Sequence, residues 1–295
     1  MATKQGIDLS YVQTNVDYKK LKAAGIDFAI IRAGYGRDLS QKDTMFEKHY
    51  KGCKDAGIKV GAYWFSYAVS ESDAVTEANT CLNIIKGKTF EYPIYYDVEN
   101  QSQFARGKSF CDSITKAFLS KLESAGYYVG LYTSRYPAQT YFSQSVLNKY
   151  ALWLAEYGSK LNYSGTYGMW QNSSTYRVNG INGDVDHDYC YVDYPTIIKN
   201  GGYNGYKKPT PAKTKKTLDT KGYKKGCQPT TGVYAVKKLI TLAYKKQIIT
   251  QSVNNDKIFG NGTEKAVNQL LKKWGYKENG IAGDNFVEKL EKILE

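Results

Sequence analysis

The chain is predicted to be an α/β protein, with an irregular β/α barrel followed by a small all-helical domain. Across residues 1–200, short apolar or aromatic runs alternate with helix-like segments. The runs recur every ~25–35 residues, which is the length of one β/α unit. Such repeats build a parallel sheet, either closed into a barrel or open with helices on both faces. No glycine-rich phosphate loop follows a strand, and this favours the barrel.

The strand-like runs of the first domain are continuous enough to be covered on both faces. They are predicted at residues 7–9, 28–33, 60–67, 92–98, 128–133, 152–155 and 169–171. Helices are predicted at residues 17–24, 42–56, 70–85 and 109–125. Gly25 and Gly57 end the first two helices, and Ser70 is the expected N-cap of the third. From Tyr150 onward no clear helix separates the strands, so we expect an irregular barrel.

A linker and a helical domain follow. Residues 201–219 are rich in Gly, Pro and Lys and lack apolar periodicity, which predicts a linker partly stiffened by Pro209 and Pro211. Residues 220–295 carry three amphipathic stripes, enough to close a small core. The stripes are Val233, Val236, Leu239, Ile240 and Ala243; Ala266, Val267, Leu270 and Leu271; and Val287, Leu290, Ile293 and Leu294.

The net charge of +13 is unevenly distributed along the 295 residues. Residues 1–200 hold 22 Lys and Arg against 20 Asp and Glu, a net charge of +2. Residues 201–295 hold 19 against 8, a net charge of +11. This asymmetry is typical of an anionic partner such as nucleic acid, a membrane surface or an acidic wall polymer, although a merely soluble lysine-rich surface would look the same.

Cysteine and histidine usage excludes several chemistries. The five cysteines are scattered without a C-x-x-C pair, so we expect reduced, buried thiols and no disulfide framework. Only His49 and His187 are present, which argues against a zinc amidase or peptidase, and no metal or cofactor is expected. We also expect no secretory signal, because the N-terminus lacks an apolar segment, and no membrane insertion, because no run approaches ~18 apolar residues.

Four acids are predicted at strand ends on one edge of the barrel, where β/α barrels carry their active sites. Asp97 and Glu99 close the run YPIYYDVE with a spacing of two, so a strand points both to one side. Asp8 ends the first strand, and Asp186 follows the last strand-like segment. Paired carboxyls suit acid catalysis on a glycosidic bond, although a D-x-E triplet by itself is more often a solvated strand end.

Aromatic and polar residues share the predicted rim. Each aromatic ring is about as often simple core as it is a ligand platform. Ring faces can stack on sugars and carboxylates can bind sugar hydroxyls, so an acidic, aromatic cleft indicates a glycan site, whereas a phosphate site would need basic groups. The candidate substrate-binding residues are Arg32, Tyr35, Tyr63, Phe65, Tyr132, Trp153, Trp170 and Gln171.

Taken in order, these segments resemble a known family. The sequences are GIDLS (6–10), IIRAGYG (30–36), GAYWFSYA (61–68), YPIYYDVE (92–99), GLYTS (130–134), LWLAEY (152–157) and MWQNSS…GINGDVDHD (169–188). They are similar to glycoside hydrolase family 25, the Chalaropsis-type lysozymes. The resemblance implies an irregular, TIM-like β/α barrel and N-acetylmuramidase activity, the hydrolysis of the β-1,4 bond between N-acetylmuramic acid and N-acetylglucosamine in peptidoglycan.

The resemblance also implies roles for the acids. Glu99 matches the proton donor, Asp97 its companion carboxylate, and Asp8 and Asp186 the other two active-site aspartates. After Asp186 the chain reads His-Asp, where a more apolar residue and Asn are usual in the family. We expect His187 at the rim or just behind the site.

Two routes to cleavage stay open. We expect Glu99 to remain protonated because neighbouring carboxylates make its ionisation costly. A water activated by an aspartate would invert the anomeric centre. Attack by the substrate's own N-acetyl group, with Asp97 steadying the charged intermediate, would retain it. The second route is slightly favoured, because the close D-x-E carboxylates leave little room for an opposed base.

The C-terminal module, residues 220–295, resembles more weakly the three-helix peptidoglycan-binding domain. The matching segment is NNDKIFGNGTEKAVNQLLKKWGYKENGIAGDNFVEKL. Lys257 replaces the pattern's first glycine, Asn279 its second aspartate, and Gln269-Leu270 stand near the usual Phe-Gln. The implied role is cell-wall binding, and the positive charge suits anionic wall polymers through a salt-sensitive attraction.

Competing functions are a barrel that binds wall glycan without cleaving it, a glucosaminidase and a nucleic-acid-binding protein. The last is disfavoured because no nucleic-acid module is recognisable and the predicted cleft is acidic. For the setting, we expect a phage endolysin that is made in the host cytoplasm and reaches the cell wall through a separate release factor. A secreted bacterial autolysin is the alternative.

Overall fold

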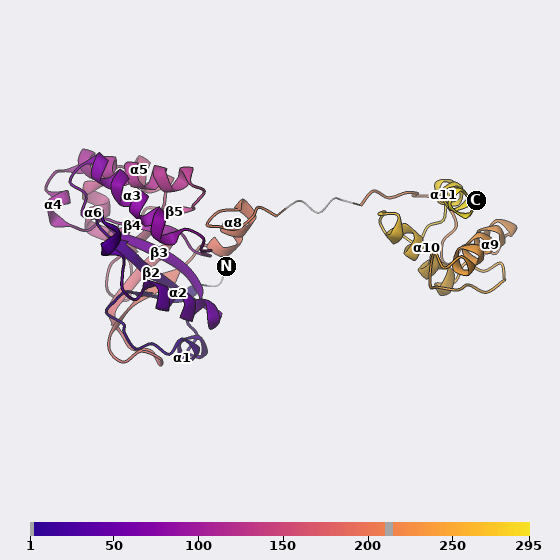
Figure 1. Cartoon of the computed structure of the whole chain (residues 1–295), viewed down its shortest axis with the longest axis horizontal. Helices are drawn as coiled ribbons and strands as arrows, with labels where there is room; N and C mark the ends of the chain where they lie inside the picture. The colour runs from indigo at the N-terminus through magenta and orange to yellow at the C-terminus, as the bar shows by residue number, and fades with distance from the viewer. Residues whose placement is uncertain (1–2, 210–214) are drawn as a thin grey trace. The chain divides into compact units, whose positions relative to one another are not determined.

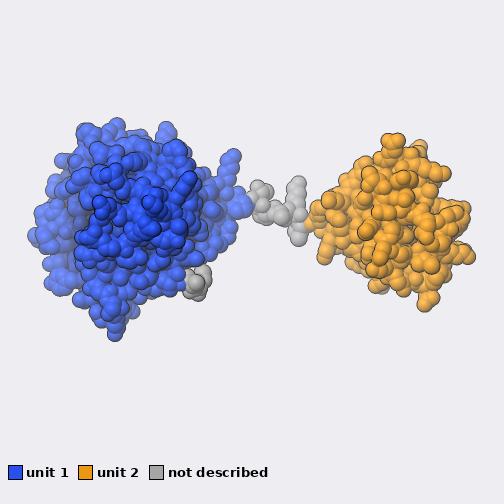
Figure 2. Space-filling view, turned by 90° about the horizontal axis from the view of Figure 1, so that it is seen from below, with its two compact units in different colours: residues 1–209 blue, residues 210–295 orange. Residues whose placement is uncertain are grey.

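The chain divides into two compact units, residues 1–209 and residues 210–295 (Figures 1 and 2). The computed structural model describes residues 3–209 and 215–295. Within these ranges, no helix is both long enough and apolar enough to cross a membrane.

Unit 1 is a closed eight-stranded barrel whose strands follow chain order. The strands are β1 (Lys4–Leu9), β2 (Phe28–Tyr35), β3 (Lys59–Phe65), β4 (Ile94–Asp97), β5 (Val129–Ser134), β6 (Ala151–Ala155), β7 (Met169–Tyr176) and β8 (Val185–Cys190). The predicted irregular α/β barrel is therefore confirmed.

The expected parallel arrangement holds for the seven predicted strands but not for β8, which was not predicted. Neighbouring strands from β1 to β7 are parallel, but β8 is antiparallel to both β7 and β1. Only residues 177–184 connect β7 to β8. A parallel crossover needs a dozen or more residues, so this short connection forces a hairpin and reverses the strand.

Helices pack on the outside of the barrel, as the β/α alternation predicted. They are α1 (Tyr18–Ala23), the 3₁₀ turn η1 (Leu39–Gln41), α2 (Phe46–Asp55), α3 (Glu71–Ile85), α4 (Gln101–Phe104), α5 (Lys108–Ser124), α6 (Arg135–Tyr141), α7 (Gln144–Lys149) and α8 (Tyr194–Gly201). The Ser70 hydroxyl caps α3 by accepting from Asp73 N at 3.0 Å. Sequence reasoning missed α4, α6, α7 and α8, because short helices carry no full amphipathic stripe.

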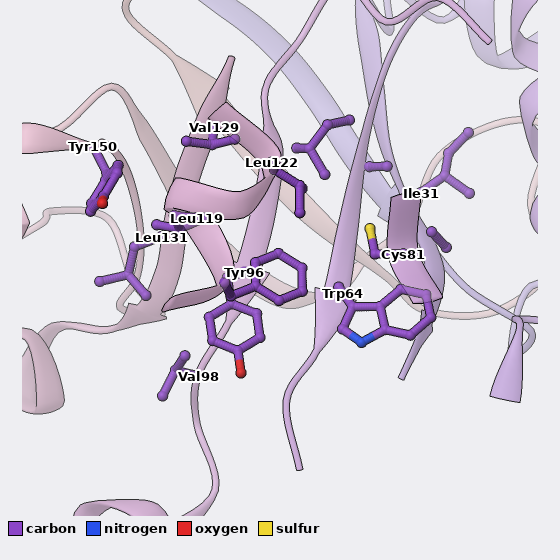
Figure 3. Packing of buried hydrophobic residues seen from close by; sticks show 14 of the residues in the cluster. Ile31, Trp64, Cys81, Tyr96, Val98, Leu119, Leu122, Val129, Leu131 and Tyr150 are labelled. Carbon is purple, nitrogen blue, oxygen red and sulfur yellow. The ribbon is translucent and has the colours of Figure 1, made fainter. Parts of the chain in front are cut away.

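Alternation along each strand separates two cores. Outward side chains pack against helices, and α3 and α5 lie side by side on the same part of the barrel (Figure 1). In Figure 3, Tyr96 of β4 lies among these apolar side chains beside Leu119 and Leu122 of α5. Its ring stacks on Phe118 with centroids 3.9 Å apart. Inward side chains instead form an aromatic layer that ends in the acids of the barrel mouth.

Unit 2 contains three helices, α9 (Thr231–Lys245), α10 (Asn261–Lys273) and α11 (Asp284–Leu294). Their stripes face one another in a common core, although Ile293 is 39% exposed. Thr230 caps α9 by accepting from Val233 N at 3.2 Å. The small core thus arises from the predicted helical periodicity.

Both ends of the expected linker belong to the units themselves. Asn204 is buried in unit 1, where its Oδ1 accepts from Tyr128 N at 2.7 Å. Asp219 is buried in unit 2, where its Oδ2 accepts from Phe286 N at 2.9 Å. The middle of the predicted linker, residues 210–214 with Pro211, lies outside the described residues.

Candidate active site

Strand ends bring the four predicted acids to the mouth of the barrel. Asp8 of β1 lies directly opposite Asp186 of β8 in the antiparallel pairing. Asp97 ends β4, and Glu99 follows it by two residues. Asp8 and Asp97 are buried, Asp186 is partly buried and Glu99 is exposed. Asp186 lies within β8, not beyond the last strand as expected, because the polar sequence VDHDYC forms a strand of its own.

A fifth acid, Asp188, completes the cluster. It follows Asp186 by two residues in β8, so both side chains point into the barrel. Trp153 Nε1 donates to Asp188 Oδ1 at 2.8 Å. Among the described residues, Asp188 Oδ2 and Asp97 Oδ1 are buried without a hydrogen-bond partner. Sequence reasoning gave Asp188 no role, although the alternation from Asp186 was the signal that would have found it.

Two of the predicted substrate-binding residues form a hydrogen-bond chain to Asp8. The Tyr132 hydroxyl donates to Gln171 Oε1 at 2.8 Å, and Gln171 Nε2 donates to Asp8 Oδ2 at 2.8 Å. Tyr132 and Gln171 are both buried. They therefore fix the orientation of the Asp8 carboxyl from inside the barrel.

The aspartates inside the barrel all resist ionisation. Burial raises the pKa of Asp8 well above its ordinary value, and the charges of Asp186 and Asp188 add to the rise, while the hydrogen bond from Gln171 opposes it. Burial also raises the pKa of Asp97 well above its ordinary value, with the charge of Glu99 adding and that of Arg32 opposing. Burial removes water from both carboxyls, and this loss of hydration disfavours the ionised carboxylate.

The same physics acts on Glu99. Its side chain reaches solvent, yet the protein around it removes enough water to raise the pKa of Glu99, and the charge of Asp186 adds to the rise. The pKa of Glu99 is therefore shifted upward, as expected. The largest cause is loss of hydration, and the neighbouring carboxylates that we expected to dominate come second. A carboxyl in this state is suited to donate a proton.

Beside the acids lies a cavity of about 460 Å³. Its walls include Arg32, Tyr35 and Phe65, which were predicted to bind substrate, and also Tyr11 and Tyr67, which were not. The remaining lining residues are Ser40, Lys42, Asp43 and Thr44. Arg32 is held in place, because its Nε donates to Asp43 Oδ2 at 2.6 Å and its guanidinium lies 4.6 Å from the centre of the Tyr11 ring.

Three other predicted rim residues are packed into the protein. Trp153 is 1% exposed inside the barrel, with its ring 6.2 Å from that of the half-buried Tyr63. Trp170 is 7% exposed and donates from Nε1 to Glu156 O at 2.8 Å. Both tryptophans therefore present little ring surface to solvent, and their role in substrate binding stays a prediction.

His187 lies behind the site. It is buried on the outer face of β8, where its Nδ1 is 2.7 Å from Asn172 Oδ1 and its ring lies 4.2 Å from that of Tyr176. Within the part of the chain that the structure describes, no three His, Cys, Asp or Glu residues are arranged to hold a metal ion. The five cysteines there are unpaired, and four of them are buried.

Sequence comparisons match the barrel. The family model described as Glycosyl hydrolases family 25 covers residues 7–181. An autolytic lysozyme of Clostridium acetobutylicum is 33% identical over 191 residues, which is 62% of this chain and 55% of that protein. Lysozyme M1 of Streptomyces globisporus is 28% identical over 208 residues, 62% of this chain and 66% of that protein. The chain thus spans between about half and two thirds of these relatives.

Solved structures give the same picture. The CTP1L endolysin has a TM-score of 0.60 and 28% identity, covering 67% of this chain and 70% of its own. The bacterial lysozyme of Streptomyces coelicolor has a TM-score of 0.56 and 25% identity, covering 65% and 94%. The modular autolysin LytC of Streptococcus pneumoniae, in complex with a synthetic peptidoglycan ligand, has a TM-score of 0.58 and 28% identity, covering 64% and 47%.

Proposed function

The chain belongs to glycosyl hydrolase family 25, and on that premise we propose that it is a lysozyme that cleaves peptidoglycan. The bond is the β-1,4 linkage between N-acetylmuramic acid and N-acetylglucosamine. The observation that carries the proposal is the group of carboxyls at the barrel mouth, Asp8, Asp97, Glu99 and Asp186, all with raised pKa values. Similarity to two lysozymes and to a structure holding a peptidoglycan ligand supports it.

In the proposed reaction, Glu99 donates its proton to the leaving glycosidic oxygen. Its exposure lets it reach substrate, and its raised pKa keeps the proton available. Asp97 faces the positive charge that develops on the sugar ring, and Arg32 favours its ionised form against the cost of burial. Gln171 fixes Asp8 beside Asp186, so that this pair can hold sugar hydroxyls.

For the second half of the reaction, we propose attack by the substrate's own N-acetyl group. The support is the spacing of Asp97 and Glu99, which places both on one strand end with no opposed carboxyl assigned as a base. Proton NMR of the first product formed checks this route. Retention of the β-anomer is expected, and an initial α-anomer would contradict it.

The decisive test of the activity is digestion of purified cell wall followed by identification of the new reducing ends. We expect muramic acid at those ends. Glucosamine ends would assign the activity to a glucosaminidase, and no new ends at all would show a glycan-binding protein. Either of these outcomes would overturn the proposed bond specificity.

For unit 2, we propose binding to the bacterial cell wall and its anionic polymers. Residues 210–295 hold 17 Lys against 8 Asp and Glu, and this net charge of +9 and the compact three-helix core support this role. The proposed place of action of the whole chain is the bacterial cell wall, in the manner of an endolysin, and the similarity to the CTP1L endolysin supports that setting.

A further inference from the structure

A buried carboxyl outside the acid cluster connects α3 to both sides of the site. Glu77 is fully buried. Its Oε1 accepts from Tyr67 N at 2.7 Å, and its Oε2 accepts from the Tyr96 hydroxyl at 2.7 Å. Tyr67 lines the cavity beside Arg32, and Tyr96 immediately precedes Asp97. One side chain therefore contacts the loop after β3 and the strand that carries the D-x-E motif.

Hydrogen bonds extend this connection around the motif. The Tyr96 hydroxyl is 2.7 Å from Ser66 Oγ. Gln103 Nε2 donates to Ser66 Oγ at 2.8 Å and to Ala68 O at 3.0 Å. Ser66 N in turn donates to Asp97 O at 3.0 Å. Because Gln103 belongs to α4, just after Glu99, the network holds the backbone on both sides of residues 97–99.

The same network supports the aromatic wall of the cavity. The Tyr67 ring lies 5.0 Å from that of Phe65 and 5.9 Å from that of Tyr35. Tyr67 is 49% exposed, so its backbone anchor at Glu77 is a main constraint on where the ring lies. A change at Glu77 is therefore transmitted to the surface that faces substrate.

We propose that Glu77 is a positioning residue that anchors the aromatic wall through Tyr67, and that its protonation, relayed through Tyr96 and Ser66, selects between two states of that wall. This inference rests on the proposed function of the site. In the ionised state the carboxylate accepts from both partners. In the protonated state its O–H donates to the Tyr96 oxygen, and the Tyr96 and Ser66 hydroxyls reverse.

The reversed state has a ready acceptor. After reversal, the Ser66 hydrogen needs an oxygen, and Gln103 Oε1 is buried without a partner among the described residues. Rotating the Gln103 amide brings this oxygen to Ser66 and gives up the bond to Ala68 O. The loop that carries Tyr67 is then held by one contact fewer, so protonation loosens the aromatic wall.

The surroundings of Glu77 place the change near neutral pH. Burial raises the pKa of Glu77 to about 7, while hydrogen bonds from Tyr96, Tyr67 N and Ser66 oppose the rise and the charge of Asp73 adds to it. Asp73 is itself paired with Arg37 at 2.6 Å. Two further titratable neighbours are the Tyr96 hydroxyl and the Cys81 thiol one turn along α3, and the charge of Glu77 disfavours ionisation of both.

Steady-state kinetics on soluble peptidoglycan fragments test the proposal. The Glu77→Gln amide donates to Tyr96 and so imitates the protonated state at every pH. At pH 8 we expect KM to rise about fivefold with kcat little changed, because roughly one hydrogen bond to the loop is lost. At pH 5.5 the variant and the wild type should agree. An equal defect at both pH values, or a fall in kcat alone, would overturn the two-state role.

The matched control is Glu71→Gln, an exposed carboxyl in the first turn of the same helix. It should leave KM and its pH dependence unchanged. A second variant, Tyr96→Phe, keeps the ring that stacks on Phe118 and removes the hydroxyl. Loss of a bond that favours the ionised form should move the KM transition to higher pH. A transition that stays in place would contradict the network.

A measurement without catalysis separates this inference from the proposed function. In full-length protein labelled with nitrogen-15 tyrosine, the Tyr67 amide signal is identified by its loss in Tyr67→Phe. We expect its chemical shift to titrate near pH 7 in the wild type and to stay flat in Glu77→Gln. A flat wild-type signal sinks the inference. Absence of any peptidoglycan cleavage, with the amide still titrating, would instead refute the proposed function alone.

Discussion

The acid cluster of unit 1 and the buried lysine of unit 2 differ in how well their polar atoms are satisfied. Unit 1 encloses Asp8, Asp97 and Asp188, and carboxylate oxygens of Asp97 and Asp188 there lack partners among the described residues. An unpartnered buried acid is costly, and such groups persist where a reaction needs them. The presence of these buried, unpartnered acids in the barrel is therefore best explained by a role in the proposed reaction.

Unit 2 buries a cation that is fully satisfied. Lys237 is 1% exposed, and its Nζ donates to Asn254 Oδ1 at 2.9 Å and to Ile258 O at 3.0 Å, and pairs with Asp256. These oxygens hold the loop before α10 against α9. A buried charge whose donors are all used stabilises one conformation. We infer from this difference that the hydrogen-bond partners of a buried ionisable group, more than its burial, distinguish a reactive site from a structural one.

The largest effect should come from Glu99→Gln, which sharpens the catalytic side of this contrast. The amide cannot donate an acidic proton, so we expect kcat/KM for wall fragments to fall about a thousandfold. The fold should be unchanged, because Glu99 is exposed. Turbidity loss of purified walls and circular dichroism measure the two properties. Substantial wall lysis by the variant would remove Glu99 from its role.

On the structural side, Lys237→Met should destabilise unit 2 and spare the chemistry. Loss of the charged hydrogen bonds is expected to lower the free energy of unfolding by about 2–3 kcal/mol. Urea unfolding followed by the indole NMR signal of Trp274, assigned by its loss in Trp274→Phe, reports on this unit. The exposed neighbour gives the control Lys238→Met, which should change little. Equal stability of the two variants would show that the buried lysine is dispensable.

A smaller, pH-dependent effect is expected from Asp188→Asn. Burial raises the pKa of Asp188 well above 3.8, with the charge of Asp186 adding and the Trp153 hydrogen bond opposing. A raised pKa in the folded state stabilises at low pH and loses that stabilisation as pH rises through the folded value. The asparagine keeps the Trp153 contact and cannot ionise. Its unfolding free energy should exceed that of the wild type by about 1 kcal/mol or more near pH 8, and the gap should close near pH 4.

Thermal unfolding at several pH values measures that gap. A difference that does not vary with pH would mean that the pKa of Asp188 is the same in the folded and unfolded protein, and would contradict the raised pKa. A wall-cleavage assay of Asp188→Asn should show a loss of activity only if Asp188 also orients Asp8 and Asp186 in the reaction.

The smallest effect is expected from removing unit 2. Residues 1–209 should cleave soluble fragments as the full chain does, and should bind purified walls about fivefold more weakly at low salt. Adding salt should close the difference, because screening weakens the attraction between lysines and anionic polymers. Co-sedimentation with walls measures binding. A salt-independent difference would point to uncharged contacts of unit 2 with glycan.

The sequence predicts an element well when the interactions that form it lie within that element, and poorly when they come from distant parts of the chain. Apolar runs and helix caps predicted β1 to β7 and the long helices, because their signals lie within each segment. The stripes of unit 2 likewise follow from helical periodicity. β8 was not predicted, because its alternating pattern is carried by Asp186, His187 and Asp188, whose burial depends on partners in β1 and β7. The ordered start of the expected linker depends on Asn204 bonding to Tyr128, 76 residues away.

The site shows the same limit. Strand ends predicted Asp8, Asp97 and Glu99 at the barrel mouth, where the structure has them, since alternation along a strand decides which side chains point inward. Asp186 joins them from β8, a strand that was not predicted. Alternation along a strand does not show how far a side chain lies from the barrel mouth. Trp153 was therefore predicted at the rim, although it is buried within the barrel. Glu77 and Tyr67 were missed because their roles arise from hydrogen bonds between separate elements.

The most direct test of the central claim is the titration of the Glu99 carboxyl in the full-length protein. Carbon-13 labelling of glutamate side chains, with the signal assigned by its loss in Glu99→Gln, follows this group through pH. The structure predicts a pKa above the ordinary value of 4.5, because burial and the charge of Asp186 disfavour the ionised form. A midpoint at or below 4.5 would contradict a Glu99 that keeps its proton for the leaving group.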